Sequence, residues 1–361
     1  MLLKKMEVFY VPYREDWSHP ADRRRLLILN SSRDFHIQSR DSTDAHVIFL
    51  SNGANFAKWI DKASVPVLID LVDGYLGEKS YFMKDFFRNT VRSLKGESSL
   101  KWITYTRHLR YACKRADMVI VASIEQAEII KKFNLNVRVI LDDHSELVKN
   151  DHTFKSSTAL NGIFWEGFAV NLKHFKFIAD ELDDFLYESN LTLHLVTERH
   201  FYKISNRFVK VDTLKLIKKL FPKSFKSIEL VDWSIESLRE VASHSKFAII
   251  PLERSDKFAQ LKSENKLLSM WMLNTPCLVS PTPSYQRVIG LCNQPFVLVN
   301  QGEWGNKLRE INTNKRLLED SISRGHNYLQ QHHTREILIQ HWKDVLNSVS
   351  PRPENFNDRT K

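Results

Sequence analysis

Short runs of apolar, often β-branched residues alternate with longer helical segments along almost the whole chain, and this alternation constrains the fold more than any other feature. The runs are continuous over about four to six residues instead of alternating with polar ones, which is typical of strands buried on both faces. A chain that repeats strand, helix and strand in this way predicts an α/β protein with doubly wound parallel sheets.

One segment shows the repeating unit clearly. Asp117–Ala122 reads as a buried strand, and Ser123 and Gln126 then form the pattern of a capping box, in which both side chains satisfy free N–H groups of a helix. Lys132 lies at the end of that helix, where the helix dipole favours a positive charge, and Val137–Leu141 is the next strand. The segment is therefore predicted to be a βαβ unit.

The same reading predicts the other elements. In the first half, the predicted strands are Val8–Val11, Arg25–Leu29, Val47–Ser51, Val65–Leu71, Met118–Ala122 and Val137–Leu141, and the predicted helices are Ala54–Lys62, Tyr81–Leu94 and Ser99–Arg115. In the second half, the predicted strands are Gly162–Trp165, Thr192–Val196, Ser227–Val231, Phe247–Pro251, Cys277–Ser280 and Phe296–Val299. The predicted helices there are Leu172–Tyr187, Ile235–Ser243, Ser263–Leu273, two between Trp304 and Arg324, and Thr334–Val349.

The length of 361 residues is about twice what one hydrophobic core needs, so two domains are expected. The segment Leu141–Ala159 is polar and has no apolar period, which predicts a linker. We therefore expect an N-terminal domain over residues 1–150 and a C-terminal domain over residues 151–333. A helix over 334–350 is expected to cross back to the first domain, and residues 351–361 read as a loose tail.

The composition, with 42% hydrophobic and 27% charged residues, is that of an ordinary globular protein and excludes a disordered or collagen-like chain. The net charge of +10 favours anionic partners. No apolar run is long enough for a membrane span or a signal peptide, so a cytoplasmic location is expected. The three cysteines form no CxxC pair, no metal site or cofactor is predicted, and no nucleic-acid-binding motif occurs.

The basic, amphipathic segment Tyr81–Leu94 suggests peripheral contact with an anionic membrane, although packing in the core explains it better.

The most informative stretch lies between Pro251 and Pro281. Glycine is scarce, with 10 residues in the chain, and neither a GxGxxG fingerprint nor a P-loop occurs. A helix predicted to open near Ser263 carries Lys262 and Lys266, four residues apart, beside its free N–H groups. Such an arrangement can bind a diphosphate. The alternative is that both lysines are solvated and Ser263 is an ordinary N-cap.

The run KSENKLLSMWMLNTPCLVS from Lys262 to Ser280 resembles the donor-binding segment of GT-B glycosyltransferases related to family 4, of which the chain looks like a divergent example. Two other stretches support this resemblance, Arg115–Ser123 near the end of the first domain and Ile163–Gly167 at the start of the second. The resemblance implies two Rossmann-like domains facing a cleft, a nucleotide-sugar donor bound mainly by the second domain, and catalysis that needs no metal.

The resemblance also assigns candidate residues. Gly167 would let the backbone approach the diphosphate, while Lys262 and Lys266 would neutralise it and Lys266 would stabilise the leaving group. The other implied donor contacts are Asn171 and Lys173 after the glycine, Ser263 and Asn265 at the helix start, and Asp256 toward the sugar hydroxyls. Asp256 is equally well explained as a loop cap.

The chain departs from the family at one signature. The two glutamates of the E-x7-E pattern would fall at Leu261 and Ser269, and neither is acidic. Glu264 is expected on the wrong side of the helix to replace the glutamate that usually holds the ribose. Three alternatives stay open: another residue binds the ribose, the chain represents a divergent subgroup, or donor binding is lost.

In the first domain, the predicted strand Val65–Leu71 runs into two carboxylates, Asp70 and Asp73. Asp73 matches an aspartate of the family and is a candidate to orient the acceptor hydroxyl or act as general base. The alternatives are a structural role for Asp70, which we favour, and turn capping for Asp73. Arg24, within the cluster Arg23–Arg25, would suit a phosphorylated or lipid-diphosphate acceptor, although a solvated charge run explains the cluster as well.

The sequence is thus interpreted as a hexosyltransferase, retaining by analogy with the family, that acts on a glycan or lipid-linked acceptor in surface polysaccharide or glycoconjugate biosynthesis. Two alternatives stay open. A catalytically inactive interaction module is favoured by the missing glutamates. A nucleotide-sugar epimerase would need acidic and histidine residues converging on the sugar, and the sequence provides no convincing set.

Overall fold

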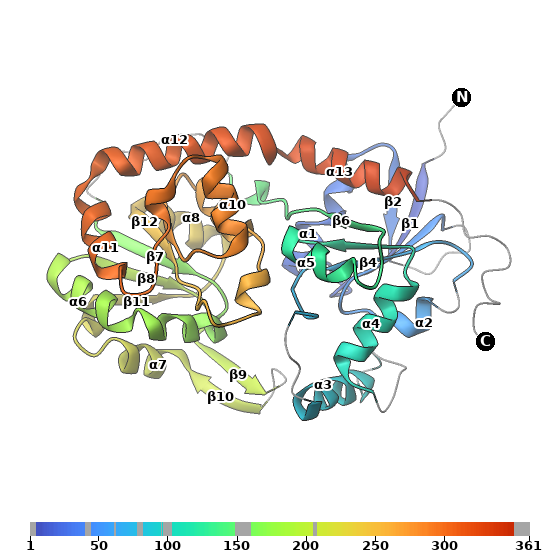
Figure 1. The fold of residues 1–361 in the computed structure, drawn as a ribbon, viewed down its shortest axis with the longest axis horizontal. Helices are drawn as coiled ribbons and strands as arrows, with labels where there is room; N and C mark the ends of the chain where they lie inside the picture. The colour runs from blue at the N-terminus through green and yellow to red at the C-terminus, as the bar shows by residue number, and fades with distance from the viewer. Residues whose placement is uncertain are drawn as a thin grey trace. The chain divides into compact units, whose positions relative to one another are not determined.

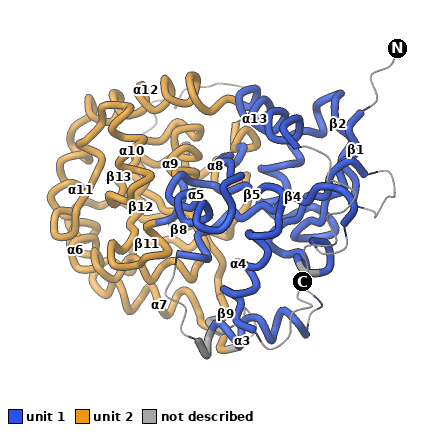
Figure 2. Tube along the Cα trace, turned by 45° about the vertical axis from the view of Figure 1, so that its right-hand side comes forward, with its two compact units in different colours: residues 1–143, 261–263, 335–361 blue, residues 144–260, 264–334 orange. Residues whose placement is uncertain are grey.

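The computed structural model describes residues 5–39, 45–60, 63–77, 82–94, 96, 103–148, 160–204 and 208–349. The chain forms two compact units (Figure 2). Unit 1 comprises residues 1–143, 261–263 and 335–361, and unit 2 comprises residues 144–260 and 264–334. The predicted tail, most of the predicted linker and the start of the helix predicted at Ser99 lie outside the described residues.

Unit 1 is built on a six-stranded parallel sheet in the order β2-β1-β3-β4-β5-β6 (Figure 1). Its strands are β1 (Met6–Val11), β2 (Phe35–Gln38), β3 (Val47–Leu50), β4 (Val67–Leu71), β5 (Met118–Val121) and β6 (Val137–Val139). Its helices are α1 (Pro20–Arg23), η1 (Leu26–Ser31), α2 (Phe56–Ile60), α3 (Phe82–Leu94), α4 (Tyr105–Arg115), α5 (Ile124–Ile130) and α13 (Arg335–Asn347).

Both faces of this sheet are buried, which explains the continuous apolar runs. Val67 and Ile69 of β4 lie in a cluster with residues of α2, α4 and α5. Leu68, on the opposite face, lies in a second cluster with residues of η1 and with Trp342 of α13. Because successive side chains of a strand point to opposite faces, one strand supplies both cores.

Unit 2 is built on a five-stranded parallel sheet in the order β11-β8-β7-β12-β13. Its strands are β7 (Gly162–Glu166), β8 (Thr192–Val196), β11 (Ile228–Val231), β12 (Ser245–Ile250) and β13 (Cys277–Val279), with a separate antiparallel pair β9 (His200–Ile204) and β10 (Phe208–Asp212). Its α-helices are α6 (Ala179–Ser189), α7 (Thr213–Leu220), α8 (Ile235–His244), α9 (Asn265–Met272), α10 (Pro283–Leu291), α11 (Trp304–Thr313) and α12 (Lys315–His332). Short 3-10 helices are η2 (Ser145–Leu147), η3 (Ala169–Phe177), η4 (Phe225–Ser227), η5 (Ala259–Leu261), which runs into unit 1 at its last residue, and η6 (Pro295–Val297).

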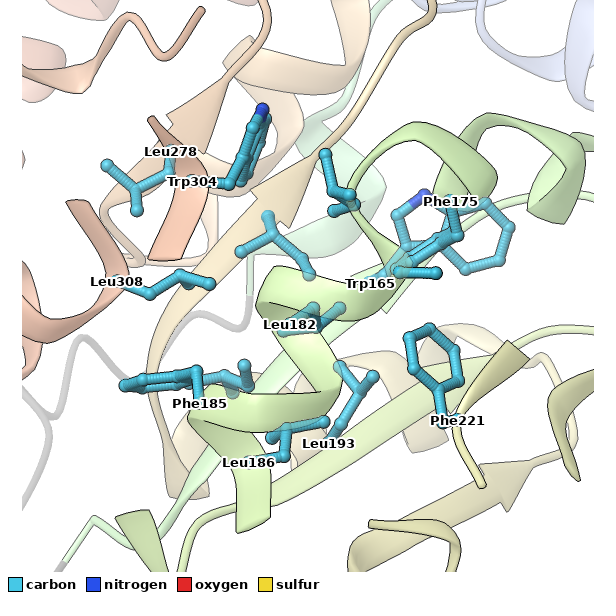
Figure 3. Close-up of a cluster of buried hydrophobic side chains, with 14 of the residues drawn as sticks. Trp165, Phe175, Leu182, Phe185, Leu186, Leu193, Phe221, Leu278, Trp304 and Leu308 are labelled. Carbon is cyan, nitrogen blue, oxygen red and sulfur yellow. The ribbon is translucent and has the colours of Figure 1, made fainter. Parts of the chain in front are cut away.

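One large cluster fills one face of this second sheet (Figure 3). Trp165, Leu193 and Leu278 from three strands pack with Leu182 of α6 and Trp304 of α11. The alternate strand residues point to the other face, and α8 contacts β7, β8 and β12. Helices on both faces of two parallel sheets confirm the predicted doubly wound α/β class.

The βαβ unit at residues 117–139 is confirmed. The Ser123 hydroxyl accepts a hydrogen bond from the Gln126 N–H at 3.1 Å and caps α5, while β5 and β6 pair in parallel. In unit 1 the predicted strand Arg25–Leu29 is wrong, because these apolar residues form η1 and bury Ile28 in the core as a 3-10 helix. The edge strand β2 follows it and was not predicted.

Three predictions in unit 2 also need correction. The first half of the predicted strand Phe296–Val299 belongs to η6, and in its second half a single parallel bridge joins Leu298 to Val279. The predicted helix Leu172–Tyr187 is split into η3 and α6, and the helix predicted from Ser263 begins at Asn265. The β9–β10 hairpin, α7 and α10 were not predicted.

Gly325 fixes how α12 packs on α9. A Cβ at Gly325 would lie 2.6 Å from Cγ of Trp271, a side chain that is almost fully buried. Gly325→Ala is expected to lower the free energy of unfolding by about 1–3 kcal/mol through this clash. Gly290→Ala is the matched control, since nothing lies within 4 Å of a Cβ in α10, and it is expected to be neutral or stabilising. Urea unfolding of both variants measures the difference, and equal stability would contradict the packing argument.

Candidate functional site

The carboxyl end of β7 holds the first candidate cluster. Gly167 follows the strand with φ +154°, and a Cβ there would lie 2.6 Å from Nζ of Lys266. The Lys266 ammonium donates a hydrogen bond to the backbone carbonyl of Glu166 and lies 3.4 Å from the Glu166 carboxylate. It also lies 5.1 Å from the ring centroid of Trp165, a cation–π contact. Glycine is therefore required for a cation to sit against this turn.

Lys266 comes from the first turn of α9, so its charge lies where that helix leaves its backbone N–H groups without intrahelical partners. Its side chain is 27% exposed, so part of it reaches solvent. An ammonium has three donors, and the Glu166 carbonyl takes one of them. Gly167 and Lys266, predicted separately, are thus brought together in unit 2.

A second pair of predicted residues also meets in unit 2. Lys173 Nζ lies 2.6 Å from Oδ2 of Asp256, whose other oxygen accepts hydrogen bonds from the N–H groups of Phe258 and Ala259. Burial raises the pKa of Asp256, but the hydrogen bond from Lys173 and the backbone donors outweigh it and lower the pKa below the usual range. Asp256 is therefore a charged loop cap that also holds Lys173.

His174 adds a contact that sequence reasoning missed. The buried imidazole accepts a hydrogen bond at Nδ1 from the Glu253 N–H at 3.2 Å, and its Nε2 lies 3.8 Å from Asp256. Its position next to Lys173 in the chain was the available signal. The histidine connects η3 to the loop after β12 and so fixes the two segments that carry Lys173 and Asp256.

The remaining predicted donor residues of unit 2 lie at the starts of two helical segments. Asn171 is half-buried in η3, and its N–H donates to the Phe168 carbonyl at 2.8 Å. Asn265 is the first residue of α9 and is also half-buried. The buried Glu264 before it pairs with Arg287 at 3.0 Å. Glu264 is thus committed to an ion pair.

Ser269 occupies the place of the second family glutamate. Its hydroxyl donates to the Lys266 carbonyl at 2.8 Å, within the helix. Trp165 and Glu166, which contact the Lys266 ammonium, are further residues that sequence reasoning missed. Both residues directly precede Gly167 in the sequence, and this position could have identified them as candidates.

Unit 1 has its own polar cluster, after β4. The half-buried Asp73 accepts a hydrogen bond from the Tyr75 hydroxyl at 3.4 Å. Burial raises the pKa of Asp73 above its usual range, and the positive charge of Lys262 together with the Tyr75 hydrogen bond offsets only part of that rise. A small pocket beside Asp73 is lined by Gly74, Gln126 and neighbouring apolar residues.

The segment Leu261–Ser263 belongs to unit 1. The Leu261 carbonyl accepts hydrogen bonds from Ser123 Oγ at 3.0 Å and from Gln126 Nε2 at 3.2 Å. Its side chain fills the space over Gly77, where a Cβ would lie 1.8 Å from Leu261 Cδ1. This anchoring holds Lys262 near Asp73.

The prediction that Lys262 and Lys266 share one helix face is wrong. The helix begins at Asn265, so Lys262 lies before it and belongs to unit 1 with the half-buried Ser263. Ser263 is not the N-cap, because Glu264 occupies that position and makes no capping hydrogen bond through its side chain. The hydrogen bonds and packing of Leu261 outweigh the weak helical preference of Lys262 and Ser263, so the helix does not extend back to them.

The arginine cluster near the chain start divides between two environments. Arg25 is fully buried, and its guanidinium binds both oxygens of Asp70 at 2.5 and 2.7 Å, Asp142 at 3.0 Å and the Ile140 carbonyl at 2.8 Å. The structural role favoured for Asp70 is confirmed. Arg24 is half-buried, and its carbonyl accepts a hydrogen bond from the Asp143 N–H at 2.7 Å.

Within the described ranges, no three histidine, cysteine or acidic side chains are grouped closely enough to hold a metal ion. None of the helices in those ranges combines the length and apolarity that crossing a membrane requires.

No family model matches the sequence, and no curated protein sequence matches it significantly. Solved structures do match. TarM of S. aureus, in complex with fondaparinux, alpha-GlcNAc-glycerol and UDP, superposes with a TM-score of 0.60 at 11% identity, over 86% of this chain and 56% of that one. The chain therefore spans little more than half the length of TarM.

Two other structures match over nearly their whole length. WaaG, a glycosyltransferase involved in lipopolysaccharide biosynthesis, has a TM-score of 0.53 at 11% identity and covers 94% of this chain and 98% of its own. The alpha-glucosyltransferase AGT, in complex with UDP and a 13-mer DNA, has a TM-score of 0.58 at 12% identity, with 95% and 100% covered. With its two units on parallel sheets, the chain has the GT-B fold of these glycosyltransferases, as the resemblance of its motifs predicts.

Proposed function

We propose that this protein is a glycosyltransferase that moves a hexose from a nucleoside diphosphate sugar to a glycan or lipid-linked acceptor, in surface polysaccharide or glycoconjugate biosynthesis. The observation that carries the proposal is the Lys266 ammonium held against Gly167 at the carboxyl end of β7. In open parallel sheets, ligands bind beyond this end of the strands. The GT-B fold and the UDP bound in the TarM and AGT structures support a nucleotide-sugar donor.

Unit 2 would bind the donor. The backbone at Gly167 would approach the diphosphate, and Lys266 would neutralise it together with the N-terminus of α9. Lys173, Asn171 and Asn265 would donate hydrogen bonds around it. Asp256, held in place by Lys173, would accept from a sugar hydroxyl.

Unit 1 would bind the acceptor. Asp73 would accept a hydrogen bond from the acceptor hydroxyl, Lys262 and Ser263 would lie beside it, and Arg24 would attract a phosphorylated or lipid-diphosphate group. Catalysis would consist of positioning the two substrates and stabilising the departing diphosphate by Lys266, with no metal, and with retention of anomeric configuration. Contact with an anionic membrane surface would bring the protein to a lipid-linked acceptor.

Calorimetric titration with UDP, GDP, ADP and CMP tests the donor site. One nucleotide is expected to bind, and Lys266→Ala is expected to weaken it at least about tenfold, which corresponds to the loss of one charge-assisted contact. Lys132→Ala, at an exposed residue of unit 1, is the control and is expected to bind as the unchanged protein does. Failure of all four nucleotides to bind would overturn the donor site.

A non-catalytic binding module is the second candidate. Leu261 and Ser269 occupy the positions where the family has acidic residues, and this favours a binding module. Glu264 favours it too, because its carboxylate forms an ion pair with Arg287. Release of free nucleotide from sugars of the nucleotide that binds separates the two functions. An enzyme is expected to release that nucleotide slowly even without acceptor, whereas a binding module leaves the donor intact.

A further inference from the structure

The β9–β10 hairpin and α7 follow each other in the chain and lie along one edge of unit 2 (Figure 1). The two strands pair antiparallel, with Phe201 opposite Val211 and Tyr202 opposite Lys210. Phe201 packs against the core cluster of unit 2. Tyr202 and Lys210 therefore face outward, because neighbouring side chains of a strand alternate between its faces.

This part of the chain is strongly basic. Residues 199–226 contain nine lysine and arginine residues and one acidic residue, Asp212, whose carboxylate caps α7 by accepting from the Lys215 N–H at 3.0 Å. We define the lysine patch as the exposed residues Lys210, Lys215, Lys218, Lys219 and Lys226.

Within the described part of unit 2, ion pairs form at the border of the lysine patch. Lys223 and Arg199 at its border pair with Asp184 and Asp232. Among the residues that the structure describes, no acidic side chain pairs with a member of the lysine patch. The patch is therefore a surplus of positive charge available to an external anion.

Three apolar side chains of the same segment are also exposed. Val209 is 57% exposed, Leu214 is 42% exposed and Tyr202 is 36% exposed. Val209 also has φ +58°, a conformation that is unfavourable for a β-branched residue. Val209 therefore combines an unfavourable backbone conformation with a solvent-exposed aliphatic side chain.

We propose that the lysine patch with Val209 and Leu214 is the surface by which this protein docks on a membrane that contains anionic lipids. Lysines attract the anionic headgroups, and the two aliphatic side chains enter the boundary between headgroups and acyl chains. Nucleic acid is the less favoured partner, because the two most exposed apolar side chains of this segment, Val209 and Leu214, are aliphatic and offer no stacking platform for bases. This inference rests on the proposed function, since it places a lipid-linked acceptor within reach of the enzyme.

Sedimentation with vesicles tests the inference without donor or acceptor. The probes are phosphatidylcholine vesicles with and without about 30% phosphatidylglycerol, at about 0.1 M salt. The full chain is expected to bind only the anionic vesicles. The variant Lys210→Glu/Lys215→Glu/Lys219→Glu is expected to bind about a hundredfold more weakly, at about fivefold or more for each lysine.

Two further variants keep the test specific. Lys114→Glu/Lys132→Glu/Lys315→Glu makes the same change of net charge at exposed residues elsewhere and is expected to retain vesicle binding within about threefold. Val209→Asn/Leu214→Gln removes the aliphatic contact and is expected to weaken binding about tenfold, since each side chain loses its burial.

The outcomes separate cleanly. Equal loss in both lysine triples, or tighter binding to duplex DNA than to anionic vesicles, would overturn the membrane surface. Unchanged vesicle binding by Lys210→Glu/Lys215→Glu/Lys219→Glu, or by Val209→Asn/Leu214→Gln, would also overturn the membrane surface. Titration of UDP, GDP, ADP and CMP into the same variants is expected to give the same nucleotide affinity as in the unchanged protein. Failure of all four nucleotides to bind the unchanged protein would count against the proposed function, while vesicle binding would still decide the docking surface.

Discussion

Asp73→Asn is expected to lower the rate of sugar transfer at least about a hundredfold while leaving nucleotide affinity within about twofold. The amide keeps the size of the side chain but cannot take a proton from an acceptor hydroxyl, and it accepts a hydrogen bond less strongly than a carboxylate. Asp73 belongs to unit 1, whereas the proposed donor contacts are in unit 2, so the variant separates transfer from donor binding.

The pH dependence of transfer sharpens this expectation. Because burial raises the pKa of Asp73, the acidic limb of the rate profile is expected above the usual range for an aspartate, with transfer increasing as pH rises through it. The limb is expected to disappear in Asp73→Asn.

Stability gives an independent check. A carboxyl whose pKa is raised in the folded state binds its proton more tightly there than in the unfolded chain, so its ionisation destabilises the fold as pH rises through that pKa. Asp73→Asn is therefore expected to be at least as stable as the unchanged protein at neutral pH. The control is Asp180→Asn, at an exposed residue of α6. Full transfer activity in Asp73→Asn would refute the role of this carboxylate.

Arg25→Met is expected to destabilise the protein by about 3–5 kcal/mol, the typical cost of removing one partner of a buried ion pair. Arg25 is fully buried and its guanidinium satisfies Asp70, Asp142 and the Ile140 carbonyl, and it also lies 5.6 Å from the ring centroid of Trp342 in α13. Methionine has a similar length but leaves the Asp70 carboxylate buried without its charged partner.

Urea unfolding followed by circular dichroism measures this loss, with Arg33→Met, at an exposed residue of unit 1, as the matched control. The double variant Arg25→Met/Asp70→Leu is expected to recover part of the stability, since it leaves no unpaired charge at Asp70. A loss below about 1 kcal/mol in Arg25→Met would mean that water reaches the site and solvates the carboxylates.

The candidate site was predicted unevenly, and particular residues show why. Gly167 and Lys266 were both predicted and do meet, because each lies directly at the end or start of an element that the local sequence specifies. Glu166 and His174 were not singled out, since their roles come from contacts with residues 79 to 100 positions away. Arg25 was assigned to a strand because its partner Asp142 is 117 positions distant and nothing local marks the pair.

The sequence by itself determined the two doubly wound parallel sheets and the cap of α5 at Ser123, because buried apolar runs and capping side chains act within a few residues. Only the tertiary structure decided that Leu261 is anchored in unit 1, 138 positions from Ser123, and that Lys262 therefore stands with Asp73 instead of on the helix of Lys266. Hydrogen bonds and close packing between distant segments determine the position of Lys262. They outweigh the local helical preference, which is worth roughly a few tenths of a kcal/mol per residue.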